Sequence, residues 1–464
     1  MMARSISFFV LTLTMLISIK VCETRAQDNW PQWRGPAQNG VSSAKNLPTT
    51  WSATENIVWK TPLPAWSGGT PIIWGDRIFV TSPSKAEPAA KMPPKESQQE
   101  TRGRRRSRGQ ARNPGGDTLL LICLSKKDGR ILWQRDLDKG NRLHRKQNNS
   151  SPSPVTDGRH VWVVTGTGAV TAFDMDGKQL WQRNLQEDYG RFGLNWGYAS
   201  SPLLYNSKLF IQVLQGYRTD DPSYVVAFDA LSGKELWRQE RPTDALAESP
   251  DAYTTPALLQ HDSQSQIVIT GGDYVTGHDP ESGTEIWRAG GLNPQKRRNY
   301  RIVASPMVVD GIVYAPTRRK PLLALRAGGK GDVSTSHLAW KWAGEAATDV
   351  PTPVCDGKHF YMVDDRGRVI CLDAKTGEVV WGPQRTVQGI VSASPLLADG
   401  KLYIINEQAV STVLAAGGEF KLLATNELDG SYTLSSPIAS GSQLFLRTAT
   451  HLYCISDAEY LPGL

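Results

Sequence analysis

The feature that most constrains this chain is a dipeptide, Ser-Pro or Thr-Pro, that opens an apolar segment eight times. The intervals between successive prolines are 83, 48, 54, 50, 47, 42 and 42 residues. The segment from Ser84 to Asp117 lies within the first interval, and without it that interval is similar in length to the others. Repeats of this length are typical of solenoids and propellers, so the chain is predicted to consist of eight units of one size. The eight pairs are Thr70-Pro71, Ser153-Pro154, Ser201-Pro202, Thr255-Pro256, Ser305-Pro306, Thr352-Pro353, Ser394-Pro395 and Ser436-Pro437.

Each unit is predicted to contain four short antiparallel strands, and residues 151–185 show the pattern most clearly. Turns that contain glycine, which accepts positive φ at little steric cost, separate its apolar segments. Those segments are residues 153–156, 160–164, 170–174 and 179–185. Four such strands per unit are the plan of a propeller blade. We therefore expect an all-β fold, an eight-bladed β-propeller of four-stranded antiparallel blades, in a single domain over residues 27–464.

A tryptophan recurs in the fourth predicted strand, usually after an Asp-Gly, Ser-Gly or Thr-Gly turn. A large ring at one fixed place in each blade is expected to pack across the neighbouring blade. The last unit ends before a fourth strand, so we expect residues 56–63 to supply it, with Trp59 as the displaced copy of the repeated ring. That strand would close the propeller and leave no open sheet edge. The repeated copies are Trp133, Trp181, Trp237, Trp287, Trp340 and Trp381.

Two segments carry the clearest family resemblance, Ala227–Trp237 (AFDALSGKELW) and Cys371–Trp381 (CLDAKTGEVVW). They resemble the repeat of the PQQ-like, or quinoprotein-like, eight-bladed β-propellers. That family includes the PQQ-dependent alcohol dehydrogenases and the non-enzymatic propeller lipoprotein of the outer-membrane β-barrel assembly machine. The opening Asn29–Pro36 (NWPQWRGP) is similar to the start of exported PQQ-like proteins of planctomycete-type bacteria. The resemblance implies the fold more firmly than the activity.

The resemblance leaves an enzymatic alternative open, a PQQ-dependent oxidoreductase of the alcohol or sugar dehydrogenase type. Those enzymes carry two adjacent cysteines near the cofactor and a Ca²⁺ site of Glu, Asn and Asp beside a catalytic Asp. No two cysteines are adjacent here, and no segment matches the metal ligands by motif. The histidines show no zinc-binding spacing, and no Gly-x-Ser-x-Gly motif is present. We therefore expect no catalytic residue, no metal and no cofactor, with PQQ reserved for the alternative.

Three of the cysteines, Cys123, Cys371 and Cys454, are predicted to occupy equivalent third-strand positions in separate units. Other units carry Ala172, Ala227 and Ala324 at that place, which indicates a small buried residue. Packed sheets lie about 10 Å apart, whereas a disulfide needs Cα atoms within about 7 Å. We therefore expect free thiols, and Cys355 has no evident partner.

The N-terminus is typical of a secretory signal peptide over residues 1–26, with Arg4, an apolar run from Phe8 to Ile19, and a cleavage site after Ala26. The apolar run is too short for a transmembrane helix. We therefore expect a soluble protein, periplasmic or secreted, and a monomer.

Two segments outside the predicted strands account for the net charge of +7. Residues 1–26 contribute +2 and residues 84–117 contribute +5, so the remaining body is neutral. Residues 84–117 are predicted to be a solvated, disordered insertion in blade one, because they are rich in Arg, Lys, Pro, Gln and Ser. The Arg-rich part, residues 101–109, has no aromatic residue that could stack on bases, so no nucleic-acid partner is expected. Contact with an anionic cell surface is the alternative role of this segment.

Positions that change chemistry from one unit to the next are the candidate functional positions. In the family, the segment before the innermost strand lies at the mouth of the central channel. The residues there that differ most are Asn149, Trp196, Asp251, Tyr253 and Arg301, and we expect them to bind a small molecule or a peptide. The alternative is that Asp251 and Arg301 only pair with each other and that the rings plug the channel. The function predicted from these patterns is a non-catalytic binding or scaffold propeller for a protein, peptide or glycan partner in the cell envelope.

Overall fold

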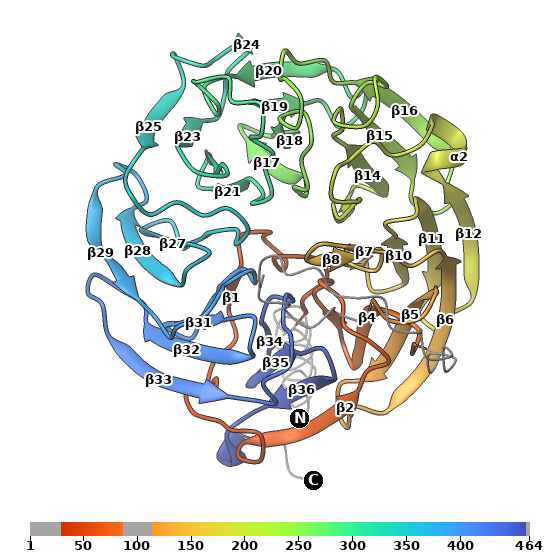
Figure 1. Cartoon of the computed structure of the whole chain (residues 1–464), viewed down its shortest axis with the longest axis vertical. Helices are drawn as coiled ribbons and strands as arrows, with labels where there is room; N and C mark the ends of the chain where they lie inside the picture. Colours follow the sequence, from red (N-terminus) through yellow and green to blue (C-terminus); the bar gives the residue numbers. More distant parts are fainter. Residues whose placement is uncertain (1–28, 87–113, 461–464) are drawn as a thin grey trace, which may run out of the picture.

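The computed structural model describes residues 29–86 and 114–460, which form eight four-stranded antiparallel blades arranged in a ring (Figure 1). The predicted fold class is therefore confirmed. The predicted signal peptide, residues 1–26, and residues 87–113 of the predicted insertion lie outside the described residues. The insertion joins the second and third strands of blade one, which end at Pro83 and begin at Thr118. No helix within the described ranges is long and apolar enough to cross a membrane.

In blades one to seven the strands follow chain order from the axis outward, whereas in blade eight the N-terminal strand is the outermost. The innermost strands are β3 (Ile72–Trp74), β9 (Val155–Thr156), β13 (Leu203–Tyr205), β17 (Ala257–His261), β21 (Met307–Val309), β26 (Val354–Cys355), β30 (Leu396–Ala398) and β34 (Ile438–Ser440). The second strands are β4 (Arg77–Pro83), β10 (His160–Val164), β14 (Lys208–Val213), β18 (Gln264–Gly271), β22 (Ile312–Ala315), β27 (His359–Val363), β31 (Lys401–Ile405) and β35 (Gln443–Arg447).

The third strands are β5 (Thr118–Ser125), β11 (Ala169–Asp174), β15 (Tyr224–Asp229), β19 (Tyr274–His278), β23 (Leu322–Arg326), β28 (Arg368–Asp373), β32 (Val410–Ala415) and β36 (His451–Ile455). The outermost strands are β6 (Ile131–Lys139), β12 (Gln179–Asn184), β16 (Glu235–Glu240), β20 (Glu285–Ala289), β25 (Leu338–Trp342), β29 (Val379–Arg385), β33 (Leu422–Glu427) and β2 (Ile57–Pro62). The elements outside this plan are β1 (Val41–Ser42), β24 (Gly331–Asp332), the hairpin β7–β8 (Leu143–His144 and Gln147–Asn148), helix α2 (Leu185–Tyr189) and the 3₁₀ helix η1 (Ala458–Tyr460).

The ring is closed by the N-terminal strand β2, which pairs antiparallel with β36 of the last blade. Trp59 lies opposite Cys454 in this pair, as Trp133 lies opposite Cys123 in blade one. The prediction that residues 56–63 complete blade eight is therefore confirmed.

Blade two has the four predicted strands, although β9 begins at Val155 where residue 153 was expected, and the end of the blade differs too. The fourth strand was expected to reach residue 185, but β12 ends at Asn184 and helix α2 begins at Leu185. The Asn184 side chain accepts a hydrogen bond from the backbone N–H of Gln186 at 2.9 Å. This is an N-cap, which satisfies a free N–H group of the first helical turn and favours helix over strand.

The repeated tryptophan connects neighbouring blades. In six blades its indole N–H donates to a backbone carbonyl in the turn between the third and fourth strands of the next blade, over 2.9 to 3.2 Å. The ring also covers the turn glycine, so a Cβ atom at Gly177 would lie 2.8 Å from the Trp133 ring. The prediction that these rings pack across blades is confirmed. Trp287 is the exception, since its N–H donates to Gln266 of its own blade.

The cysteine positions follow from the same contact. Three pairs, Cys123–Trp133, Cys371–Trp381 and Cys454–Trp59, lie at the same register as the Ala–Trp pairs of blades two, three and five. A small side chain opposite the indole leaves room for the ring, so the predicted equivalence is confirmed. All four described cysteines are buried and free.

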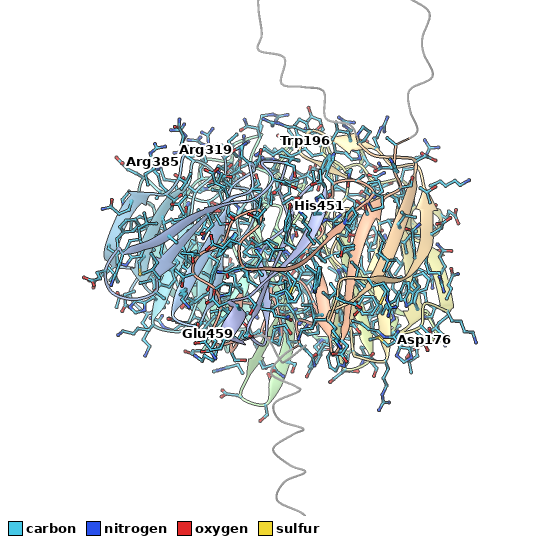
Figure 2. All side chains as sticks on the ribbon, turned by 90° about the horizontal axis from the view of Figure 1, so that it is seen from below. Asp176, Trp196, Arg319, Arg385, His451 and Glu459 are labelled. Atoms are coloured by element: carbon cyan, nitrogen blue, oxygen red, sulfur yellow. The ribbon has the colours of Figure 1, made fainter. Side chains whose placement is uncertain are left out.

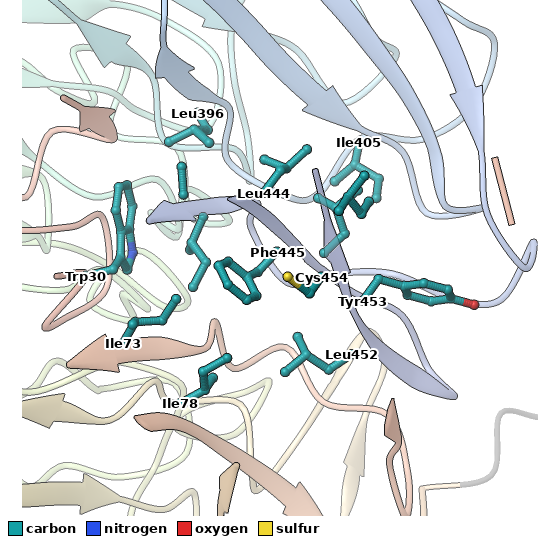
Figure 3. Close-up of a cluster of buried hydrophobic side chains, with 14 of the residues drawn as sticks. Trp30, Ile73, Ile78, Leu396, Ile405, Leu444, Phe445, Leu452, Tyr453 and Cys454 are labelled. Carbon is teal, nitrogen blue, oxygen red and sulfur yellow. The ribbon is translucent and has the colours of Figure 1, made fainter. Parts of the chain in front are cut away.

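The hydrophobic cores lie between adjacent blades, and one large cluster joins blades seven, eight and one to the N-terminal segment. Figure 3 shows Phe445 and Cys454 of blade eight between Ile78 of blade one and Ile405 of blade seven. Trp30 packs at the inner end of this cluster and is 2% exposed. Residues upstream of the repeats are therefore part of the core.

Candidate functional site

The eight Ser-Pro and Thr-Pro pairs form a closed ring of hydrogen bonds around the axis. In each blade the backbone N–H of the Ser or Thr donates to the side-chain oxygen of the Ser or Thr in the next blade, over 2.8 to 3.3 Å. The last of these bonds runs from Ser436 N–H to Thr70 Oγ1 and completes the circle. We call these eight side chains the hydroxyl ring. The sequence carries a signal for this ring, because the residue before each repeated proline is always Ser or Thr, the two small side chains with a hydroxyl group.

A cavity of about 290 Å³ lies on the axis above the hydroxyl ring, and all eight ring residues line it. The residues two positions before each ring residue form a second layer, which we call the collar. The collar consists of Gly68, Ser151, Ala199, Tyr253, Val303, Val350, Ser392 and Leu434. Above the collar lies the mouth, to which Trp196, Arg301 and Asp349 belong, together with the residues of the β7–β8 hairpin.

The N-terminal segment crosses the axis at the other end of the cavity and forms its floor. Trp30 makes two backbone hydrogen bonds to Ile73 of blade one, and the Pro31 carbonyl accepts from blade two. Gln38 accepts from blade four, and β1 pairs with β30 of blade seven. Trp33, between these contacts, lines the cavity. The cavity is therefore blind, with its opening on the mouth side.

Arg34 lies in this floor and is 2% exposed. Its guanidinium donates to the carbonyl oxygens of Pro395 at 2.6 Å and Pro353 at 2.7 Å, one residue beyond two members of the hydroxyl ring. No carboxylate pairs with it among the described residues, and burial lowers its pKa to about 9. The floor therefore carries a positive charge that is balanced only by carbonyl dipoles.

Three of the five residues predicted for ligand contact line the cavity, namely Trp196, Tyr253 and Arg301. Trp196 is held from two sides, because its backbone N–H donates to the Tyr253 hydroxyl at 3.0 Å and its indole N–H donates to Glu248 at 2.7 Å. Arg145 stacks over the Trp196 ring, with 5.3 Å between the guanidinium carbon and the ring centroid. Trp196 and Arg319 lie on one face of the propeller, and Asp176 and Glu459 lie on the opposite face (Figure 2).

Arg301 pairs with Asp349 rather than with Asp251. Two hydrogen bonds of 3.1 and 3.2 Å join its guanidinium to the two carboxylate oxygens of Asp349. Arg318 approaches the same carboxylate, at 3.7 Å. The alternative in which Asp251 and Arg301 pair with each other is therefore wrong, since the partner of Arg301 comes from the next blade.

The other two predicted residues, Asn149 and Asp251, are buried beside the cavity and outside its lining. Asn149 donates to the Gly140 carbonyl and contacts His144 Nε2 at 2.9 Å. Asp251 accepts from the backbone N–H groups of Asn195 at 2.7 Å and Tyr217 at 3.1 Å, and burial raises its pKa to about 6. Both side chains hold the backbone of the mouth loops. Ligand contact at the five positions stays a prediction.

The residues that sequence reasoning missed are cationic. Arg145 and Lys146 come from the β7–β8 hairpin, and Arg318 comes from the loop between β22 and β23. A run of three basic residues, Arg318-Arg319-Lys320, was the available signal. It was missed because the comparison of units used the segments before the innermost strands, whereas this loop joins the second and third strands.

The lining does not fit a calcium-bound quinone. Asp349 and Asp365 are its carboxylates, and the first pairs with Arg301 while the second accepts backbone N–H groups. None of the four described cysteines lines the cavity. In the described part of the chain, no three His, Cys, Asp or Glu side chains lie close enough to hold a metal.

Comparison with known proteins links the chain to one family. Residues 117–383 match the family model described as outer membrane protein assembly factor BamB. The protein of that name from Yersinia pestis is 25% identical over 335 residues, which cover 63% of this chain and 81% of the relative.

Two solved structures show the same fold. BamB from Moraxella catarrhalis has a TM-score of 0.56 at 13% identity and covers 87% of this chain and 99% of its own. A europium-containing methanol dehydrogenase has a TM-score of 0.68 at 12% identity and covers 95% of this chain and all of its own. At these identities the structures establish the fold alone.

Proposed function

Because the chain belongs to the PQQ-like propeller family described as outer membrane protein assembly factor BamB, we propose that it is a non-catalytic scaffold of the cell envelope that binds a protein partner at its mouth. A peptide or glycan group of that partner is the expected contact. Family membership supports the scaffold role, and the signal-like residues 1–26 support export to the periplasm or the exterior. We propose that the protein acts as a monomer.

The observation that carries the proposal is the fixed geometry of the mouth. Trp196 is held by Tyr253 and Glu248 and stacked under Arg145. Arg301 is held in a two-point contact with Asp349. Side chains that are already ordered lose little conformational entropy on binding, and Trp, Tyr and Arg are the residues that most often dominate binding energy. The mouth thus offers an ordered aromatic and cationic surface beside an open cavity.

Site-specific photo-crosslinking in intact cells tests which face binds. A benzoylphenylalanine at Arg319 lies on the mouth face, and one at Asp176 lies on the opposite face as the matched control. We expect a discrete adduct from position 319 and none from position 176. An adduct from position 176 alone would place the partner on the other face.

Substitution then tests the residues. Arg301→Ala is expected to reduce the yield of the position-319 adduct about tenfold, because one charge-assisted hydrogen bond contributes about 1.5–3 kcal/mol. Variants at Asn149, Trp196, Asp251 and Tyr253 extend the series, each checked for folding by circular dichroism. Unchanged capture by folded variants at all five positions would move the function away from the mouth.

The enzymatic alternative, a PQQ-dependent oxidoreductase, rests on the shared fold with the methanol dehydrogenase. The carboxylates of the cavity are already engaged by Arg301 and by backbone N–H groups, which weighs against it. The test is the absorbance spectrum of the purified protein mixed with PQQ and Ca²⁺. A spectrum equal to the sum of its components supports the scaffold, and a shifted quinone band supports the oxidoreductase.

A further inference from the structure

The hydroxyl ring presents eight hydrogen-bond donors that the described part of the protein does not use. Each side-chain oxygen accepts one backbone N–H. Within the described ranges, none of the eight hydroxyls donates to a protein acceptor, and no two of them bond to each other. A hydroxyl that accepts one bond still has its own hydrogen to donate. Because all eight residues line the cavity, a molecule inside it can accept these hydrogens.

Among the side chains that line the cavity, basic groups outnumber carboxylates. Arg34 lies beneath the hydroxyl ring without a carboxylate partner. Arg145, Lys146, Arg301 and Arg318 line the upper part, against Asp349 and Asp365. Glu407 additionally pairs with Lys146, at 2.9 Å. Hydroxyl donors between a buried guanidinium and a cationic mouth are complementary to oxygen atoms that carry negative charge.

A bound cation would also contact oxygen atoms, but the surroundings disfavour it. The hydroxyl ring and the collar contain no carboxylate. Ca²⁺ sites in proteins depend on carboxylate ligands, and the guanidinium of Arg34 would repel a cation at the floor. The electrostatics of the cavity therefore select an anion.

From these observations we propose that the blind cavity binds a small organic anion, a molecule that carries one or more carboxylate or phosphate groups. Its charged group lies against the hydroxyl ring above Arg34, and its other end faces Trp196 and Tyr253. A volume of about 290 Å³ is at the small end of ligand pockets, which fits a single small metabolite rather than a polymer. This site lies below the mouth and does not depend on the partner proposed above.

A matched pair of variants at Val303 tests the proposal. Val303 is half-buried in the collar, two residues before Ser305, and makes no polar contact with its side chain. Val303→Asp places a negative charge beside the ligand, and Val303→Asn places a neutral group of the same size there. The probes are citrate and inorganic phosphate, titrated by calorimetry into the full chain at constant ionic strength. Thermal midpoints verify that both variants are folded.

We expect saturable one-site binding of at least one probe to the wild type. Val303→Asp should weaken it about tenfold or more, because two like charges repel strongly in a partly buried cavity. Val303→Asn should remain within about threefold of the wild type. Equal affinities of the two variants would place the anion elsewhere on the surface and overturn the proposal. Absence of saturable binding by both probes would overturn it as well, and so would Ca²⁺ binding that Val303→Asp strengthens.

Discussion

The contact between Arg301 and Asp349 makes a quantitative prediction about the mouth. The two side chains are 12% and 21% exposed, and two hydrogen bonds of 3.1 and 3.2 Å join them. Exposed pairs contribute about 0.2–1 kcal/mol, whereas hydrogen bonds to charged groups with little solvent access contribute about 1.5–3 kcal/mol. Arg318 approaches the same carboxylate, which reduces the coupling energy that belongs to the Arg301–Asp349 pair alone. We therefore expect a coupling energy between these two ranges, on the order of 1 kcal/mol or somewhat more.

A double-mutant cycle measures this coupling. Arg301→Ala, Asp349→Ala and the double variant are compared with the wild type by urea unfolding, with tryptophan fluorescence as the signal. A second cycle pairs Arg301→Ala with Asp251→Asn and serves as the matched control. We expect the coupling given above in the first cycle and additivity in the second, since Asp251 bonds to backbone N–H groups instead. A larger coupling in the second cycle than in the first would refute the assignment of the pair.

Three other properties can be measured directly. Thiol titration of the mature chain under denaturing, non-reducing conditions should find four free groups, because the cysteines occupy separate blades and are buried; two or fewer would contradict the blade alignment. Replacement of residues 84–117 by a short Gly-Asp turn should leave the thermal midpoint nearly unchanged, because the polar segment is expected to add little to the core; a loss of several degrees would show that it packs. Burial raises the pKa of Asp251 to about 6 in the folded state, whereas the pKa is about 3.9 in the unfolded state. The folded protein therefore binds this proton more tightly than the unfolded chain does. Its contribution to stability should therefore increase as the pH falls from about 6 to 4, and the wild type should gain stability over Asp251→Asn in that interval.

The repeat allowed much of the architecture to be predicted. The spacing of the Ser-Pro and Thr-Pro pairs fixed the number of blades, and the early end of the last unit indicated that residues 56–63 close the ring. The equivalence of Cys123 with Ala172 followed from position within the unit and was confirmed by the register opposite tryptophan. These predictions succeed because the same inter-blade contact recurs, so each unit provides evidence about the others.

The site was less predictable, because its chemistry lies where the units differ. Position within a unit places Arg301 at the mouth, but the reach of a long side chain selects Asp349 of the next blade as its partner. Asp251 occupies an equivalent position and turns instead to backbone N–H groups. The floor could not be predicted, because residues 29–42 have no counterpart among the repeats. Their placement depends on contacts with five different blades.

That floor also has a consequence for how the molecule is assembled. Residues 29–62 precede the repeats in the chain, yet they bond to blades one, two, four, six and seven and supply the outer strand of blade eight. Contacts that are distant in sequence form slowly, because the loop entropy must be lost before the contact is gained. Trp30 and Pro31 can bond to blades one and two early, but β2 can pair only once β36 has been synthesised. A chain that is cut short before Gln443 would lack β35 and β36, and β2 would have no strand to pair with. Synthesis of the C-terminal strands is therefore required before the N-terminal strand can join the fold.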